Sequence, residues 1–75
     1  MTSLAEWPLD QAARVVRVLG DGEVSCRLLE MGLTPGVEVR IVGTAPWGDP
    51  LELDVRNYRL SLRRSEAALV EVERP

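Results

Sequence analysis

A helix that ends abruptly is the feature that most constrains the fold of this chain. Apolar residues recur at the i, i+4 and i+7 spacing of one helical stripe, at Val24, Leu28 and Met31. Gly32 follows the last of them, where a glycine in the left-handed conformation closes the final turn and allows Leu33 to contact Leu28. The sequence therefore predicts a short helix that ends at Gly32.

A tight turn and a strand follow this helix. Pro35 presets the first corner of the turn, and Gly36 supplies a positive φ at the second. Beyond the turn, Val37, Val39 and Ile41 alternate with polar residues, as in a half-buried strand. Residues 43–50 then form a loop, with further structural turn residues at Gly48, Asp49 and Pro50.

Four other segments have the composition or alternation of short strands. They are residues 14–19, which end at a Gly-Asp-Gly turn, residues 51–56 and 58–63, which form a hairpin about Asn57, and residues 70–73. The hairpin has acidic residues on one arm and arginines on the other, a pattern that favours cross-strand charge pairs. Residues 65–67 suit a single helical turn. Five short strands with one helix after the first of them predict a mostly β fold, a small and strongly bent barrel.

Two expectations concern the chain before the turn-closing glycine. Residues 1–11 mix Trp7 and Pro8 with polar residues without a period, so we expect an N-terminal arm whose docking the sequence leaves open, followed by a barrel domain over residues 12–75. Asp21 and Glu23 open the helix, where carboxylates cap free backbone N–H groups and face the positive end of the helix dipole.

Three blocks of this sequence, in order and in register, resemble the FeoA family. They are Arg27-Leu28-Leu29-x-Met31-Gly32-Leu33-x-Pro35-Gly36, then Ala45-Pro46-x-Gly48-Asp49-Pro50, and finally Leu60-x-Leu62-Arg63-Arg64 leading to Ala68-Leu69-Val70-Glu71-Val72. The resemblance implies a small Src-homology-3-like (SH3-like) barrel without catalytic activity. It also implies a cytoplasmic protein that accompanies FeoB, the membrane transporter of ferrous iron.

The composition excludes several classes of function. The net charge of −3 and the pI near 4.8 oppose binding to a phosphate backbone, so we expect no nucleic-acid partner. All nine basic residues are arginine and histidine is absent, which removes the usual catalytic base and the commonest transition-metal ligand. A lone thiol, at Cys26, fits a reducing cytosol. No apolar run approaches the ~20 residues that span a bilayer, so we expect no membrane insertion.

The sequence contains few candidate ligands for a metal ion. Cys26 is the single soft ligand, whereas stable zinc and iron sites need three or four nitrogen or sulfur ligands. Weak binding of iron or zinc through carboxylates, especially across a homodimer, remains open for the set Glu52, Asp54, Glu71 and Glu73. The regular alternation of these residues is better explained by a solvated strand face. We therefore expect no tightly bound cofactor.

The candidate partner-binding residues are Leu29, Leu33, Trp47 and Cys26. Trp47 lies between Pro46 and Gly48, where it is either a protruding anchor or a lid over the end of the barrel. Leu29 and Cys26 lie on the far side of the helix from its apolar stripe and are candidates for exposure. A further alternative is the wet face of the hairpin around Arg56 and Arg59.

The leading functional hypothesis is a non-catalytic accessory module of ferrous iron uptake that docks on cytosolic parts of FeoB. The alternative is a metal-responsive regulatory domain, related to the C-terminal barrel of repressors of the DtxR type. The 75 residues leave no room for a helix-turn-helix, so such a repressor requires a second polypeptide.

Overall fold

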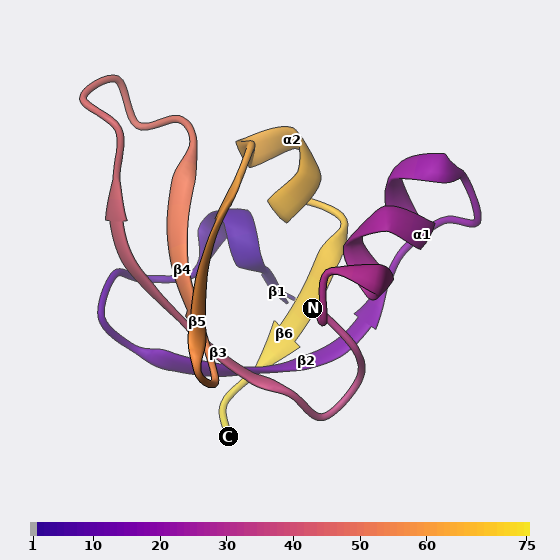
Figure 1. Ribbon diagram of the computed structural model, residues 1–75. Coiled ribbons are helices and arrows are strands. Elements are labelled where there is room, and N and C mark those ends of the chain that lie inside the picture. Colours follow the sequence, from indigo (N-terminus) through magenta and orange to yellow (C-terminus); the bar gives the residue numbers. More distant parts are fainter. Residues whose placement is uncertain (1) are drawn as a thin grey trace.

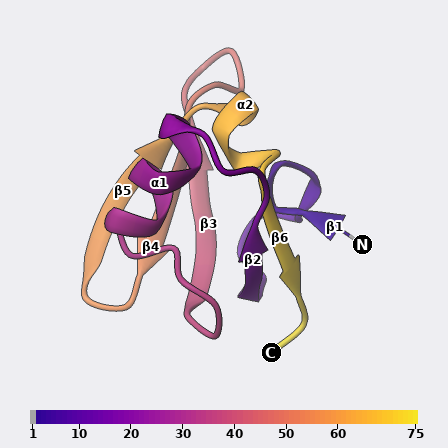
Figure 2. The same cartoon turned by 90° about the vertical axis from the view of Figure 1, so that its right-hand side faces the viewer.

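The computed structural model describes residues 2–75, in which six strands form one antiparallel sheet in the order β1-β6-β2-β3-β4-β5 (Figure 1). The strands are β1 (Thr2–Ser3), β2 (Ala12–Val18), β3 (Glu38–Thr44), β4 (Leu51–Val55), β5 (Tyr58–Leu62) and β6 (Val70–Glu73). The helices are the 3-10 helix η1 (Leu4–Glu6), α1 (Glu23–Glu30) and α2 (Arg64–Ala67). The sheet bends around a core, with α1 on one side and α2 at one end (Figures 1 and 2).

The core consists of the apolar side chains that alternate along the strands. Ala13 and Val15 of β2, Val39 and Ile41 of β3, and Leu53 of β4 are all at most 2% exposed. On β3 and β4 the neighbours that point away from the core are Glu38, Arg40, Glu52 and Asp54, as the alternation predicted, whereas Ala12 and Val16 on the outer side of β2 are apolar and half-buried. The mostly β barrel predicted from the sequence is confirmed.

The N-terminal arm docks on the barrel and adds a strand that the sequence did not predict. Thr2 lies opposite Val72 and Ser3 opposite Glu71, so β1 extends the sheet at β6. Leu4 follows in η1 and is fully buried in the core. Two paired residues are too few to show an alternation in the sequence, so this strand was not predicted. The sheet has six strands within residues 2–75, where five were expected.

Helix α1 ends as predicted, at a glycine with positive φ. Gly32 has φ +104°, and its N–H donates to the Leu29 carbonyl at 3.0 Å. The Leu33 N–H donates to the Leu28 carbonyl at 3.2 Å, which completes a Schellman motif. Leu28 and Leu33 are both fully buried, so the hydrophobic contact that accompanies this motif lies in the core.

The apolar stripe predicted for α1 is wrong at its first position. Val24 is 38% exposed, whereas Ser25 is buried and turns inward with Leu28. The Ser25 hydroxyl donates to the Leu19 carbonyl at 2.5 Å, which fixes the rotation of the first turn about the helix axis. A polar side chain can occupy this buried position because the end of the preceding strand supplies its hydrogen-bond partner.

The cap expected from Asp21 is also wrong. The N-cap residue is Gly22, and no side chain caps the helix there. Glycine is an accepted N-cap because its backbone adopts the required extended conformation freely. Glu23 does lie in the first turn, where its charge faces the positive end of the helix dipole.

The β4–β5 hairpin forms as predicted, with a two-residue turn at Arg56 and Asn57. Asp54 lies opposite Arg59, and Arg59 Nε donates to Asp54 Oδ1 at 3.1 Å. This contact confirms a cross-strand charge pair on the outer face. The preceding strand β3 runs to Thr44, past the predicted boundary, because a register shift after Ile41 continues its pairing with β4.

Candidate protein-interaction site

The β3–β4 loop presents Trp47 to solvent. The Gly48 N–H donates to the Ala45 carbonyl at 2.7 Å, which closes a four-residue turn with Pro46 and Trp47 at its corners. Gly48 has φ +82°, a conformation that favours glycine. The Trp47 side chain at the tip is 93% exposed, so the lid interpretation is wrong and the residue protrudes.

Arg64 fixes the base of this loop to the rest of the molecule. Its backbone N–H donates to Asp49 Oδ1 at 2.9 Å, and its Nε donates to the Gly48 carbonyl at 2.5 Å. Its Nη1 donates to the Ala5 carbonyl of η1 at 3.2 Å. One arginine at the start of α2 therefore joins the loop, the N-terminal arm and α2, and Trp47 projects from an anchored loop.

Hydrophobic periodicity does not indicate this arrangement. Arg64 acts on residues 15, 16 and 59 positions away in the chain. The same holds for Tyr58, whose hydroxyl donates to the Met31 carbonyl at the end of α1. Such contacts depend on the tertiary arrangement of elements and leave no local pattern.

A second exposed apolar surface lies on α1. Leu29 is 39% exposed, and the thiol-bearing Cys26 is exposed one turn before it. Leu33, the remaining candidate contact residue, is fully buried because it closes the Schellman motif against the core. Leu33 is therefore not available to a partner. In Figure 1, α1 and the tip of the β3–β4 loop lie at opposite sides of the molecule, so Leu29 and Trp47 belong to separate surfaces.

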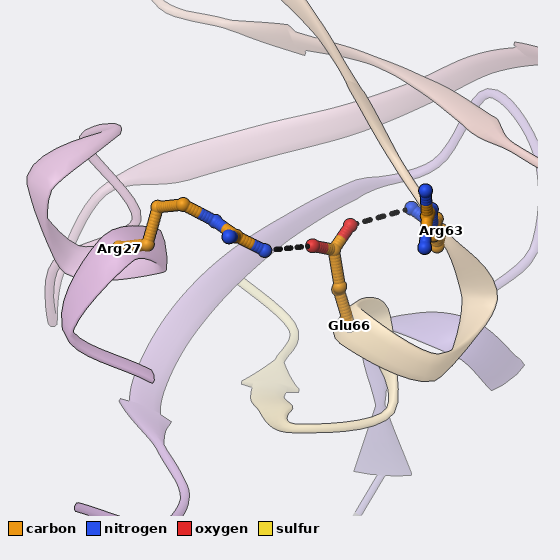
Figure 3. A network of polar contacts seen from close by, with 3 residues as sticks. All are labelled: Arg27, Arg63 and Glu66. Carbon is orange, nitrogen blue, oxygen red and sulfur yellow. Dashed lines mark hydrogen bonds and ion pairs between the residues drawn. The ribbon is translucent and has the colours of Figure 1, made fainter. Parts of the chain in front are cut away.

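An ion pair joins the two helices. Arg27 Nη2 of α1 lies 2.8 Å from Glu66 Oε2 of α2 (Figure 3). The other carboxylate oxygen, Oε1, accepts a hydrogen bond from the Arg63 backbone N–H at 2.9 Å. This backbone hydrogen bond and then the Arg27 guanidinium lower the pKa of Glu66, and they outweigh the partial burial that acts in the opposite direction.

Two of the acidic residues considered as metal ligands form ion pairs with arginines. Glu71 Oε1 lies 3.0 Å from Arg17 Nε, in an ion pair without hydrogen-bond alignment, and Asp54 is paired with Arg59. Residues 2–75 contain no group of three or more histidine, cysteine, aspartate or glutamate side chains placed to hold a metal ion. In the part of the chain that the structure describes, no helix is long and apolar enough to cross a bilayer.

The fold and the site define a small SH3-like β-barrel module with an exposed aromatic residue on an anchored loop. The family model described as the FeoA domain matches residues 2–74. The chain belongs to the FeoA family, which is linked to ferrous iron transport.

Sequence and structure comparisons agree on this assignment. An Fe(2+) transport protein A/Fe(2+) transporter FeoB fusion protein of Porphyromonas gingivalis is 41% identical over 70 residues, which are 93% of this chain and 8% of the relative. The solution structure of iron(II) transport protein A from Clostridium thermocellum is 39% identical, with a TM-score of 0.89, over 96% of this chain and 44% of that chain. Stenotrophomonas maltophilia FeoA, a crystal structure with zinc described as a procaryotic SH3 domain protein, is 38% identical with a TM-score of 0.85, over 97% of this chain and 91% of that chain.

A more distant likeness concerns the fold alone. The crystal structure of ScaR with bound Zn²⁺ has a TM-score of 0.86 and 21% identity, over 100% of this chain and 37% of that chain. The barrel therefore also occurs within a longer chain of different sequence.

Proposed function

We propose that this chain is a non-catalytic cytoplasmic accessory of ferrous iron uptake that docks on a cytosolic part of FeoB. The observation that carries the proposal is Trp47, 93% exposed at the tip of a loop that Arg64 anchors. When a partner covers a large apolar side chain that was in full contact with water, the free energy of the system falls and binding is favoured. Because the loop is already anchored, less conformational entropy is lost when the interface forms.

Two relatives support FeoB as the partner in this proposal. The Porphyromonas gingivalis relative joins transport protein A and FeoB in one polypeptide, which keeps the two parts together. The Stenotrophomonas maltophilia protein is described in terms of activation of ferrous iron transport. We assign the same role to this chain, with Trp47 as the leading contact residue and Leu29 and Cys26 as a second contact surface.

The alternative of a metal-responsive regulatory domain rests on the likeness to ScaR, which supports the fold alone at 21% identity. We therefore propose no second function. Iron or zinc, where it binds, is expected to bind weakly or between two copies through the carboxylates of the strands.

Uptake in cells tests the proposal. Cells that express FeoB and lack FeoA are supplied with this chain, with Trp47→Ala or with Leu9→Ala, and the initial rate of labelled ferrous iron uptake is measured. Leu9 is 54% exposed and serves as a matched control for loss of a surface apolar side chain. We expect the parent chain and the control to raise uptake, and Trp47→Ala to lose most of this effect. Equal uptake with and without the chain refutes the proposal.

A further inference from the structure

We infer that the free edge of β5 accepts an extended segment of a partner protein, with alternating apolar and acidic residues, as an added strand. This inference concerns a different surface from Trp47 and does not depend on the proposed docking on FeoB.

The edge has unpaired backbone groups. Within the described part of the chain, β5 pairs with β4 alone, and Figure 2 shows it at the rim of the molecule. Val55 and Tyr58 flank a two-residue turn, so they form a hydrogen-bonded pair, and such pairs alternate along an antiparallel ladder. The N–H and C=O groups of Arg59 and Ser61 therefore point away from β4. Neither residue has another backbone hydrogen bond within residues 2–75.

The core-facing side of this edge is partly uncovered. Leu60 packs against the core but is only half-buried, and Tyr58 on the same side is 44% exposed. The Tyr58 hydroxyl donates to the Met31 carbonyl, which holds the ring in place beside the end of α1. Apolar side chains of an added strand would cover Leu60 and the Tyr58 ring, as cross-strand neighbours do within a sheet.

The charge at the edge selects an acidic segment. Arg56, Arg59 and Arg63 are exposed along β5 and its two ends, although the chain as a whole carries a net charge of −3. Arg56 and Arg63 have no ion pair among residues 2–75, and Arg59 uses its Nε on Asp54, which leaves its other donors available. Strand β4, which pairs with the other edge of β5, shows the pattern expected of such a segment, since its residues 51–55 alternate apolar and acidic side chains.

A second copy of this chain fits the edge poorly. In the two antiparallel registers centred on Arg59 or on Ser61, Arg59 of one copy faces Arg59 or Arg63 of the other. In the register that places Arg59 opposite Ser61, Arg59 and Arg63 of the other copy are its diagonal neighbours. Like charges directly opposite each other destabilise the pairing. The occupant that the charge favours is therefore an acidic segment of another protein.

Peptide titration of the 75-residue chain tests the inference. The probe is the blocked peptide Val-Glu-Val-Asp-Val-Glu, and its control is Val-Arg-Val-Lys-Val-Arg, which keeps the alternation and reverses the charge. Amide NMR should show shifts centred on residues 58–62, slower hydrogen exchange at Arg59 and Ser61, and weaker binding as salt rises. We expect the basic peptide to bind at least about tenfold more weakly. Failure of the acidic peptide to bind, or shifts confined to other elements, overturns the inference.

Variants of β5 separate the backbone contribution from the charge contribution. Ser61→Pro removes an outward amide without removing a hydrogen bond to β4, so it should weaken the acidic peptide about tenfold, while Ser61→Thr should not. If Ser61→Pro does not fold, the double variant Arg56→Gln, Arg63→Gln tests the charge, with weaker binding and a smaller salt dependence expected. Unchanged binding in the folded proline variant contradicts an added strand. Concentration-dependent pairing of β5 edges without peptide, seen by sedimentation and NMR, would identify a second copy as the occupant and overturn the inference.

Discussion

Gly32 meets two separate requirements at one position. Its φ of +104° lies in the region that residues with a side chain rarely adopt. A Cβ built on it would also collide with the Tyr58 hydroxyl, which lies against the end of α1. Backbone conformation therefore strongly favours glycine, and any side chain would in addition require the end of the Tyr58 side chain to move.

A β-branched residue at this position should destabilise the protein. Gly32→Val is expected to lower the free energy of unfolding by more than about 1–2 kcal/mol, the scale of left-handed strain. Urea unfolding measures the loss. In a Tyr58→Phe background the collision with the hydroxyl is absent, so a smaller cost of Gly32→Val there would isolate the contribution of space. A valine variant as stable as the parent contradicts this interpretation of the helix end.

Cys26 is exposed on α1, and residues 2–75 contain no group of three or more histidine, cysteine, aspartate or glutamate side chains that could hold a metal ion. We expect Cys26→Ser to melt close to the parent temperature, because an exposed thiol contributes little to packing. Zinc and ferrous iron should show no one-to-one binding tighter than about micromolar to the monomer, since stable sites need three or four ligands. A tight calorimetric isotherm on a confirmed monomer that is lost in Cys26→Ser would contradict this.

At the scale of elements, the Glu66 carboxylate joins α1 to α2 and links stability to pH. Its pKa is lowered from the usual 4.5 in the folded protein, so the stability it contributes is fully present above that value. It is lost as pH falls through the lower folded pKa. The Arg63 backbone N–H is the largest cause of this shift, and Arg27 adds to it.

Replacement of this carboxylate should flatten the acid limb of the stability curve. Glu66→Gln is expected to lose stability at neutral pH and to change less than the parent as pH falls below 4.5, when urea unfolding is followed across pH. Arg27→Gln should have a smaller effect, because the backbone hydrogen bond remains. Glu30→Gln, an exposed carboxylate of α1, is the matched control. Parallel curves for Glu66→Gln and the parent would show that the pairing has no effect on folding.

The sequence predicted the elements that have a local signature. Alternation located β3 to β6, and Gly32 located the end of α1. The inward turn of Ser25 was missed because its partner is the carbonyl of Leu19, which follows the end of β2. The added strand β1 was missed because it has only two residues.

The candidate site was predicted in part for the same reason. The position of Trp47 between a proline and a glycine indicated a constrained residue that either protrudes or covers the barrel. The structure shows that it protrudes. The choice of Leu33 as a contact residue was wrong, because its predicted contact with Leu28 places it in the core, where it is fully buried. Arg64 was not identified, since its hydrogen bonds join residues remote in sequence.

At the scale of the whole molecule, the barrel acts as a small rigid support for two separate exposed surfaces. Trp47 extends from the β3–β4 loop on one side, and Leu29 lies on α1 on the other (Figure 1). A single compact partner domain therefore meets one of them directly, while contact with both requires a partner that wraps around the barrel. If a compact partner meets the leading contact, Trp47, Leu29→Glu should leave the complex unchanged, whereas it should weaken a complex whose partner wraps around the barrel to reach α1 as well.

The most direct test of the central claim is calorimetric titration of the chain with the cytosolic part of FeoB, for the parent and for Trp47→Ala. We predict that Trp47→Ala loses roughly 2 kcal/mol or more of binding free energy, the scale of an interface anchor. Its thermal unfolding should match that of the parent, because the side chain is 93% exposed and packs against little of the fold. Equal affinity of Trp47→Ala and the parent, or a variant that melts far earlier, would contradict the claim that this residue anchors the complex.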